Sequence, residues 1–526
     1  MRIGVLICGD TVAPWQRKAL ELLPSDTDFT VIKATSPGPS APRRLLQHGA
    51  YYGLNVLSIR EKRVPVLDLF ENAPIMEFEP EVDGMWSRFP DTLLLELRAA
   101  ELDAVVKFGL SLLRVPTADQ LAVPILSYHH GDPREYRGRP SGFYETKHGR
   151  ESVGQIVQQI SNKLDGGRVF AFAETPVFPY SYRKTLSTAR ALSPYLLPRA
   201  LSNLHCGESE DLDPVGKNYR LPGNSSVAAH ALRTGWEKAK RSLYGAFVEK
   251  KWCVSTVQLT GDGLLSSLEN IEIEAHRWKT FDLPAGYTFV ADPFFDRQSD
   301  AIFVEALETG SGVGRLLRID HEDVDRIVRE DYHLSYPSNF IHEDQQILLP
   351  EMMAGGRQKF FALRDGRVTD ARELDIDASG LIDPTMFRDG ETFYLFGGEE
   401  VDGSSVLRLW SSGSLSGRFV EHPASPIRVS ARGSRMGGPI LSVGGKIYRT
   451  GQDHRRAYGD GVLLFEIEEL TPTAYREREV KRFAFKNRSG PHTLDLKGQT
   501  LLFDWYVDTI SPFAGWRRLR GKLARR

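Results

Sequence analysis

The chain has 526 residues, too many for one ordinary core, and this length predicts about two or three domains. A hydrophobic fraction of 41% with 26% charged residues is typical of a globular protein and excludes disordered and fibrous classes. The formal net charge of −2 argues against nucleic-acid binding through a dominant basic field.

Cysteine content and hydropathy point to the compartment. Cys8, Cys206 and Cys253 are too few and too scattered for a disulfide framework or a thiolate zinc site, and no metal is expected. The first residues, "MRIGVLICGD", lack the longer apolar region of a signal peptide, and no stretch reaches the ~20 apolar residues of a membrane span. We therefore expect a cytoplasmic protein without a transmembrane segment, with the inner face of a membrane as a second location.

Residues 1–186 alternate short apolar strands with helical patterns. Strands are expected at 2–9, 29–35, 103–109, 123–130 and 152–160, and helices at 14–23 and 91–102. This β-α-β order predicts an open, mainly parallel α/β sheet of Rossmann-like type, in which ligands bind beyond the carboxyl ends of the strands. The paired histidines in "LSYHHGDPREYRG", from Leu126, stand at such an end.

Two segments flank the rest of the chain. Residues 187–251 are expected to connect two domains through one helix, because "NSSVAAHALRTGWEKAKRSL" shows a helix start followed by helical spacing. Residues 511–526 form a basic tail, "WRRLRGKLARR" from Trp516, which favours a solvated segment over contact with phosphate or anionic lipid.

Residues 252–510 contain a five-fold repeat. An X-Pro step, an apolar residue, a turn and a second β-rich run recur at Pro293, Pro337, Pro384, Pro439 and Pro491. A β-hairpin that recurs at roughly 40 to 55 residues is typical of propeller blades, so we predict an all-β five-bladed propeller.

The repeat also predicts a site. The residue before each proline and the residue 12 to 14 positions after it should lie toward the same face, because the chain returns antiparallel. The two sets are Asp292, Tyr336, Asp383, Gly438 and Gly490, and Glu305, Glu351, Gly398, Asp453 and Asp504. Six of the ten are carboxylates, which predicts an acidic mouth.

Residues Met1 to Tyr180 resemble the folate-dependent formyltransferases, a family that includes methionyl-tRNA and sugar N-formyltransferases. The family pattern is Asn-x-His, then Tyr-Arg-Gly, then Leu/Val-Asp-x-Gly. The corresponding residues are Ser127-Tyr128-His129, Tyr136-Arg137-Gly138 and "KLDGG" with Asp165. The resemblance implies N10-formyltetrahydrofolate as the formyl donor. It places the pterin at "AVVKFGLSLLRVP", with Phe108, Gly109, Leu110, Leu112 and Leu113 as cofactor-binding residues.

The same resemblance implies roles for the site residues. His129 is the acid/base, and Asp165 orients its imidazole. Tyr136, Arg137 and Gly138 border the substrate, although for Arg137 and Gly138 a turn-shaping role is favoured over a catalytic one. Ser127 stands where the family has asparagine, so either its hydroxyl or the neighbouring His130 must replace the amide donor. Intact amine formylation, another transfer reaction and a degenerate domain all stay open.

Residues Trp252 to Asp508 resemble glycoside hydrolase family 43 propellers and, more closely, the N-terminal domain of plant glucosamine inositolphosphorylceramide transferases. The stretches "ADPFF", "LSYPSNF", "LIDPTMF" and "YRTGQDHRRAYGDG" carry the resemblance. Asp292 and Asp383 match the hydrolase base and its modulating aspartate, but "RMGGP" lacks the later glutamate. Cleavage of a glycosidic bond needs two flanking carboxylates, so glycan binding is favoured over hydrolysis. If the propeller does hydrolyse a glycan, Glu351 of another blade is the candidate for the missing acid. The expected polar and stacking contacts come from Arg435, Arg449, Gln452, Asp453, Tyr458 and His492.

These patterns together predict a sugar N-formyltransferase joined to a carbohydrate-binding propeller. The substrate would be an amino-sugar nucleotide or a glycolipid, with no nucleic-acid partner, and a homodimer is one expected assembly. Two alternatives stand beside it: a carbohydrate-binding scaffold with both folds catalytically silent, and a glycosidase or glycosyl-transfer propeller with a degenerate N-terminal half.

Overall fold

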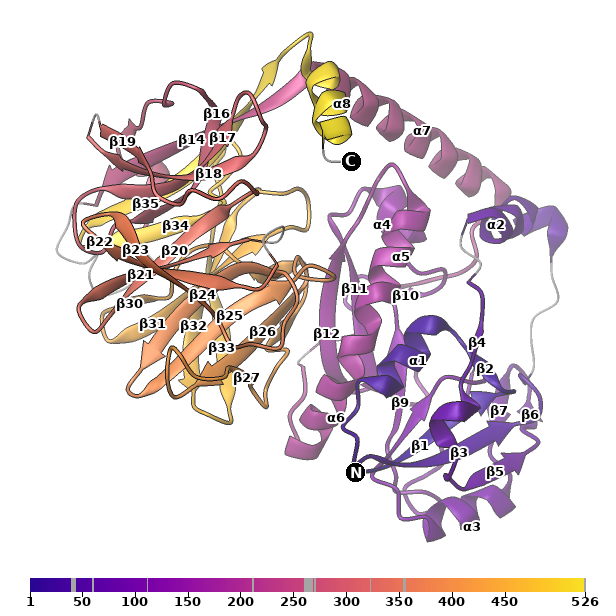
Figure 1. Ribbon diagram of the computed structural model, residues 1–526. Coiled ribbons are helices and arrows are strands. Elements are labelled where there is room, and N and C mark those ends of the chain that lie inside the picture. Colours follow the sequence, from indigo (N-terminus) through magenta and orange to yellow (C-terminus); the bar gives the residue numbers. More distant parts are fainter. Residues whose placement is uncertain are drawn as a thin grey trace. The chain divides into compact units, whose positions relative to one another are not determined.

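The computed structural model describes residues 1–38, 44–58, 61–110, 112–210, 212–259, 268, 271–321, 323–352 and 356–524 (Figure 1). The chain divides into two compact units, Met1–Lys240 and Arg241–Arg526. Among the described helices, none is both long enough and apolar enough to cross a membrane.

The first unit is built on a seven-stranded sheet. Its order is β12–β11–β9–β8–β1–β3–β5, at Val169–Pro176, Ser152–Gln159, Ile125–His129, Ala104–Lys107, Arg2–Cys8, Asp28–Ala34 and Ile75–Phe78. The five strands from β9 to β5 pair in parallel, whereas β11 and β12 pair antiparallel at one edge. The predicted mainly parallel α/β sheet is therefore confirmed. Its central strands are buried along nearly their whole length, as parallel strands covered on both faces must be.

Helices and short ribbons complete this unit. The helices are α1 (Pro14–Glu21), α2 (Leu45–Ser58), α3 (Asp91–Ala99), α4 (Phe143–His148), α5 (Tyr182–Leu192) and α6 (Leu196–Cys206). The two-stranded ribbons are β2 (Thr11–Val12) with β4 (Val64–Pro65), β6 (Glu81–Asp83) with β7 (Trp86–Arg88), and β10 (Tyr136–Gly138) with β13 (Lys217–Tyr219). Pro14 starts α1, where its fixed φ suits the first helical position and its missing N–H leaves no bond unmade.

The segment expected as a simple connector is more structured than its sequence indicates. The expected boundary between residues 186 and 187 falls inside α5. Both α5 and α6 bury apolar side chains, including Leu192, Leu196 and Leu197. The expected single helix is α7 (Asn224–Phe247), and the bound between the two compact units falls within it.

The second unit contains five antiparallel sheets, which confirms the five-bladed propeller. Four blades follow one another in the chain: β16 (Tyr287–Phe295) to β19 (Asp323–Arg326), β20 (Ser335–His342) to β23 (Arg367–Glu373), β24 (Leu381–Asp389) to β28 (Arg428–Val429), and β29 (Arg432–Met436) to β33 (Tyr475–Phe483). The fifth sheet joins both ends of the propeller, in the order β15 (Trp278–Thr280), β14 (Val248–Gln258), β35 (Thr500–Ile510) and β34 (Leu494–Lys497).

The residue before the repeat proline has a positive φ in all five repeats, and three of the five share one conformation. Asp292, Tyr336 and Asp383 have φ values of 47°, 48° and 47°, and a register shift interrupts the strand pairing at each of the three. Gly438 and Gly490 have φ values of 138° and 129°. Positive φ is costly for Asp and Tyr, and a bulge redirects the backbone toward a new neighbour.

The basic tail is partly folded. Helix α8 (Ala514–Ala524) covers most of it, and residues 516–519 of the helix are exposed, so the expectation of a solvated segment stays a prediction. Arg517 Nε donates to Glu249 Oε1 at 2.7 Å, and Arg518 Nη2 donates to the Val248 carbonyl at 2.6 Å. These bonds attach the helix to the start of β14.

Candidate active sites

His129 is the last residue of β9, at the carboxyl edge of the parallel sheet. Its Nδ1 lies 3.4 Å from Asp165 Oδ1, and its Nε2 lies 3.2 Å from the Tyr136 carbonyl. The other oxygen of Asp165 accepts the Gly138 N–H at 2.8 Å. The structure therefore brings the predicted acid/base and its carboxylate together, with side chains only 10% and 13% exposed. A carboxylate fixed in this way orients the imidazole.

The Tyr136-Arg137-Gly138 segment braces this pair. It forms β10, which pairs with β13, and Arg137 Nε donates to the Gly216 carbonyl at 2.7 Å. Gly138 has a φ of 82°, and a Cβ at this position would lie 2.2 Å from the Tyr219 carbonyl oxygen. Only glycine fits this backbone path. These contacts show how Arg137 and Gly138 shape the turn.

His130 occupies a different environment from His129. Its Nε2 lies 2.8 Å from Ser193 Oγ, and its ring meets the Trp15 ring at a centroid distance of 5.2 Å. Burial, reinforced by the charge of neighbouring His129, lowers the pKa of His130 to about 3. His130 is thus a neutral side chain held by a buried hydroxyl, and these contacts do not bring it to Ser127.

Ser127 has two polar neighbours that the sequence motifs do not contain. It pairs with Lys107 of β8 on one side and with Gln158 of β11 on the other, so all three side chains leave the same face of the sheet. Lys107 Nζ donates to the Leu110 carbonyl at 2.9 Å, and burial lowers its pKa to about 8. The available signal was a single cation that ends the apolar run "DAVV".

The predicted cofactor loop is apolar and tightly packed. A Cβ on Gly109 would lie 2.6 Å from the Ile7 carbonyl carbon, and both Leu110 and Leu113 are buried. Beside Leu113, the hydroxyl of Ser87 is buried and has no hydrogen-bond partner among the described residues. Apolar walls beside an unsatisfied hydroxyl fit a flat heteroaromatic ring with polar edges, as a pterin has.

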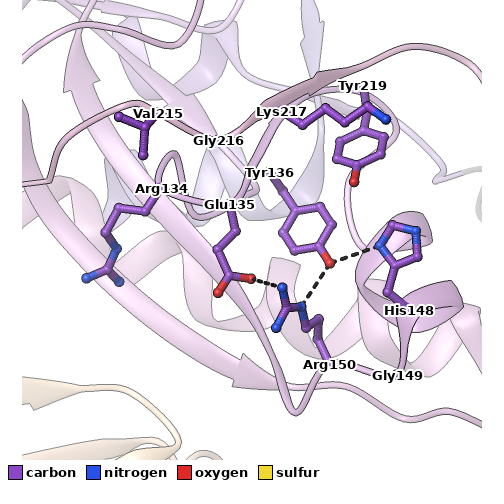
Figure 2. Close-up of a pocket in the computed structure, with 10 residues that line it drawn as sticks. All are labelled: Arg134, Glu135, Tyr136, His148, Gly149, Arg150, Val215, Gly216, Lys217 and Tyr219. Atoms are coloured by element: carbon purple, nitrogen blue, oxygen red, sulfur yellow. Dashed lines mark hydrogen bonds and ion pairs between the residues drawn. The ribbon is translucent and has the colours of Figure 1, made fainter.

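A pocket of about 600 Å³ opens beside the β10–β13 ribbon (Figure 2). Its lining residues are Arg134, Glu135, Tyr136, His148, Gly149, Arg150, Val215, Gly216, Lys217 and Tyr219. A smaller cavity that His129 lines shares Tyr136 and Tyr219 with this pocket, so the pocket adjoins the His129 site.

The pocket wall carries more positive than negative charge. Arg150 Nη2 lies 3.0 Å from Glu135 Oε2, and its Nε donates to the Tyr136 hydroxyl at 3.0 Å (Figure 2). Lys217 adds a further cation, and Arg134 adds one whose Nη2 lies 2.6 Å from Asp132 Oδ2 outside the lining. Tyr136 and Tyr219 stack with ring centroids 5.4 Å apart. Cations beside stacked rings suit a ligand that combines an anion with a flat or apolar group.

In the propeller, a histidine joins two of the predicted carboxylates. His492 Nδ1 lies 3.0 Å from Asp292 Oδ1 and 3.2 Å from Asp504 Oδ2. Burial opposes protonation of His492, yet the surrounding Tyr458 and Asp292 raise its pKa well above the ordinary value. The Asp504 oxygens also accept the backbone N–H groups of Asp292, His492 and Thr493, so this carboxylate holds two blades together.

Glu305 lies against Asp292, and the two carboxyls have opposite pKa shifts. Burial, the charge of Asp292 and that of Glu351 hold the pKa of Glu305 well above its usual range. Burial opposes ionisation of Asp292 as well, but the adjacent imidazolium of His492 lowers the pKa of this carboxyl. Glu305 Oε1 also lies 3.5 Å from His333 Nε2, so the two carboxyls have different polar neighbours.

A second buried group surrounds Asp383. Arg435 Nε donates to Asp383 Oδ2 at 2.6 Å, and Gln452 Nε2 donates to the same oxygen at 2.8 Å. Glu351 Oε2 accepts the Asp383 N–H at 3.0 Å, as Asp504 does for the equivalent residue of another blade. The Tyr336 hydroxyl donates to the Gly438 carbonyl at 3.0 Å.

Some residues predicted to contact carbohydrate form ion pairs within the protein. Asp453 is bound by Arg455 at 2.9 Å and by Arg482 at 2.8 Å, and Arg449 is fully buried on Glu477. Arginines therefore pair with some of the predicted carboxylates, and the acidic mouth stays a prediction.

Aromatic rings border the His492 group. The Tyr458 ring is 4.6 Å from His492, the Trp252 ring is 5.1 Å away, and Tyr458 is 43% exposed. His492 Nε2 is buried without a hydrogen-bond partner among the described residues. Trp252 was not foreseen, because it precedes the first repeat.

Comparison with known proteins agrees with the expected resemblances. Residues 279–496 match the family "Glucosamine inositolphosphorylceramide transferase 1, N-terminal". The glucosamine inositolphosphorylceramide transferase 1 proteins of Oryza sativa subsp. japonica and subsp. indica are each 32% identical over 209 residues, which cover 36% of this chain. The chain spans about a quarter (27%) of the length of these relatives.

Solved structures similar to this chain include formyltransferases and a formyltetrahydrofolate deformylase. Glycinamide ribonucleotide transformylase 1 from Symbiobacterium toebii is 19% identical, with 40% of this chain and 94% of that chain covered and a TM-score of 0.29. An N-formyltransferase from Helicobacter canadensis, solved with folinic acid and dTDP-3-aminofucose, is 11% identical, with 44% and 80% covered and a TM-score of 0.29. The resemblance to glycoside hydrolase family 43 stays a prediction.

Proposed function

We propose that the first unit transfers a formyl group from N10-formyltetrahydrofolate to the amine of an amino sugar in glycan or glycolipid biosynthesis. The observation that carries the proposal is the His129–Asp165 pair at the carboxyl end of β9, beside a cationic pocket. An imidazole that a carboxylate orients can take a proton from an attacking amine near neutral pH.

Each site residue has a chemical part in this proposal. Formyl-folate, held by the Phe108–Leu113 loop and the Ser87 hydroxyl, supplies the one-carbon acyl group. His129 accepts the amine proton as the new C–N bond forms, and then delivers a proton to the departing nitrogen. The Ser127 hydroxyl and the Lys107 ammonium leave the same face of the sheet as His129 and are the nearest candidates to stabilise charge on the formyl oxygen.

The pocket supports an anionic acceptor. Lys217, Arg150 and Arg134 offer hydrogen bonds and charge to a phosphate, and the stacked tyrosines offer an apolar surface. The relatives of the second unit carry names that combine glucosamine with inositolphosphorylceramide. We therefore take a phosphate-bearing amino sugar, linked either to a nucleotide or to a lipid, as the acceptor class.

The test incubates the full chain with N10-formyltetrahydrofolate and a panel of amino-sugar nucleotides, with formylated product detected by mass spectrometry. His129→Ala and Asp165→Asn should each lower kcat by about 10²- to 10⁴-fold, because both act in proton transfer. His205→Ala, at an exposed position of α6, is the matched control and should leave the rate unchanged. Absence of product with every acceptor, together with absence of folate binding, would contradict the proposal.

We further propose that the propeller binds the carbohydrate part of a substrate or intermediate. Tyr458 offers an exposed ring, and His492 Nε2 offers a buried nitrogen beside it. Binding is favoured over hydrolysis because "RMGGP" offers no glutamate where the hydrolases carry their acid, and cleavage needs two carboxylates that flank the bond.

Calorimetric titration with amino-sugar and inositol-phosphate oligosaccharides tests the propeller. Tyr458→Ala should weaken binding about tenfold, because a sugar loses its stacking surface. Trp236→Ala, which removes a 62% exposed ring of α7, is the control and should bind normally. If the chain hydrolysed chromogenic pentosides and Asp292→Asn abolished this activity, the binding proposal would be contradicted. The role of this unit would then be hydrolysis.

A further inference from the structure

Large apolar side chains are exposed where the last strand of the propeller meets α8. The residues, with their exposed fractions, are Leu243 (59%), Phe247 (49%), Ile510 (89%), Phe513 (65%), Trp516 (61%) and Leu519 (58%). We call this set the C-terminal apolar patch. Scattered single apolar residues are normal at protein surfaces, but a contiguous group of this kind marks an interaction site.

Backbone contacts place these residues in one region of the second unit. Strand β14 begins beside the end of β35, where Val248 pairs with Ile510. The Ser511 N–H donates to the Phe247 carbonyl at 2.7 Å, and a Cβ on Gly515 would lie 3.2 Å from Ala246 Cα. Figure 1 shows α8 beside the C-terminal end of α7. The end of α7, the end of β35 and α8 therefore share one surface.

Helix α8 has its polar and apolar faces in an unusual order. Arg517 and Arg518, three and four positions after the buried Ala514, are exposed but reach back to β14 and α7 through hydrogen bonds. Trp516 and Leu519, three positions apart on another face, are exposed to solvent. A soluble amphipathic helix normally buries its apolar face. This helix binds the protein through its arginines and presents its apolar side chains outward.

The sequence around the patch is strongly basic. Trp516 to Arg526 contains five arginines and one lysine and neither aspartate nor glutamate, in a chain whose net charge is −2. Tryptophan, leucine and phenylalanine beside arginine and lysine are the composition of helices that lie in the plane of a bilayer interface. Clustered cations add electrostatic attraction to anionic lipid headgroups.

We propose that the C-terminal apolar patch binds the surface of an anionic lipid bilayer, with the basic composition of residues 516–526 adding attraction to the headgroups. Helix α8 has 11 residues, too few for the ~20 that a span requires, so it lies in the interface. Phe513, Trp516 and Leu519 enter the acyl boundary. A second copy of the chain is a poorer occupant, because symmetric contact would bring two basic segments together.

Sedimentation of the full chain with vesicles tests the proposal. Vesicles of phosphatidylcholine with phosphatidylserine should carry the protein down, and vesicles of phosphatidylcholine alone should bind at least about tenfold less. Raising NaCl from low to high concentration should weaken binding to the anionic vesicles, because salt screens the headgroups. Trp516→Ser with Leu519→Ser should weaken binding about tenfold or more, because two apolar anchors are lost.

A matched pair of exposed residues provides the control. Leu232 and Trp236 on α7 are 78% and 62% exposed, so Leu232→Ser with Trp236→Ser removes the same side-chain types outside the patch. This control should bind vesicles like the unaltered chain. Equal loss in both double variants, or equal binding to both kinds of vesicle, would overturn the proposal. So would a concentration-dependent dimer in analytical ultracentrifugation that only the Trp516 and Leu519 changes dissociate.

Discussion

Glu145 is a carboxylic acid on the buried side of α4, only 3% exposed, and it lines the small cavity that contains His129. Burial raises its pKa to about 8 from a reference of 4.5, and backbone hydrogen bonds offset only part of this effect. The folded protein therefore holds one more proton than the unfolded chain between these pH values. Stability must fall as pH rises through this window, because the unfolded state gives up its proton first.

Replacing this acid should remove that dependence. Glu145→Gln should be more stable than the unaltered chain at pH 8 by about 3 kcal/mol, a rise of roughly 5 °C or more in Tm. At pH 4 the variant and the unaltered chain should have similar stability, since position 145 then carries a neutral side chain in both proteins. Differential scanning calorimetry from pH 4 to 9 measures the difference. Glu151→Gln, at an exposed position, is the control, and an equal pH effect there would refute the assignment.

At the residue scale, a sequence motif locates those site residues that occur at a characteristic spacing along the chain. His129, Tyr136-Arg137-Gly138 and Asp165 lie together as the motif order predicts. Lys107, Glu145 and Ser87 could not be found in this way, because their importance comes from burial and from neighbours distant in sequence. The sequence places His130 beside His129, but strand geometry sends its ring to Ser193.

At the scale of single elements, the periodicity of the sequence predicts most strands but not the backbone distortions within them. The five X-Pro repeats and the two early helices were predictable, because each has a simple spacing. The positive φ angles at Asp292, Tyr336 and Asp383 were hidden, since glycine or asparagine normally marks such a position. Their N–H groups can then point to a neighbouring blade, as in the bonds to Asp504 and Glu351.

Pairing between adjacent strands also explains the position of Lys107. Strand β8 ends at this lysine, and β9 carries Ser127 and His129 on the face that Lys107 shares. The Asn-x-His part of the family pattern lies on one strand, so a polar residue on the next strand is not included in it. A serine in place of asparagine therefore does not by itself indicate a degenerate domain.

At the scale of the whole molecule, the propeller is a ring closed by its two ends. Strand β14, at the beginning of the propeller, pairs along its whole length with β35, at the end of the propeller. The pairing runs from Val248–Ile510 to Gln258–Thr500. The closing sheet buries Val254, Leu501, Leu502 and Phe503. Closure removes two free sheet edges that would otherwise be exposed to other chains.

Truncations at two points should separate ring closure from the role of α8. A chain that stops after Gly498 lacks β35 and should lose the cooperative thermal transition of the propeller and aggregate, because β14 has lost its partner. A chain that stops after Pro512 keeps β35 and should retain that transition. Calorimetry and light scattering compare the two. A cooperative propeller transition in the shorter chain would show that closure is dispensable.

The pairing of β14 with β35 also sets a schedule for protein synthesis. At roughly 5 to 20 residues per second, the ribosome needs about ten seconds or more after making β14 before β35 exists. During that interval the first unit, Met1–Lys240, is complete in sequence, while the propeller has four growing blades and an open edge. Helix α8 follows β35 in the chain. Chaperone demand for the propeller should therefore be greatest in the interval before β35 leaves the ribosome.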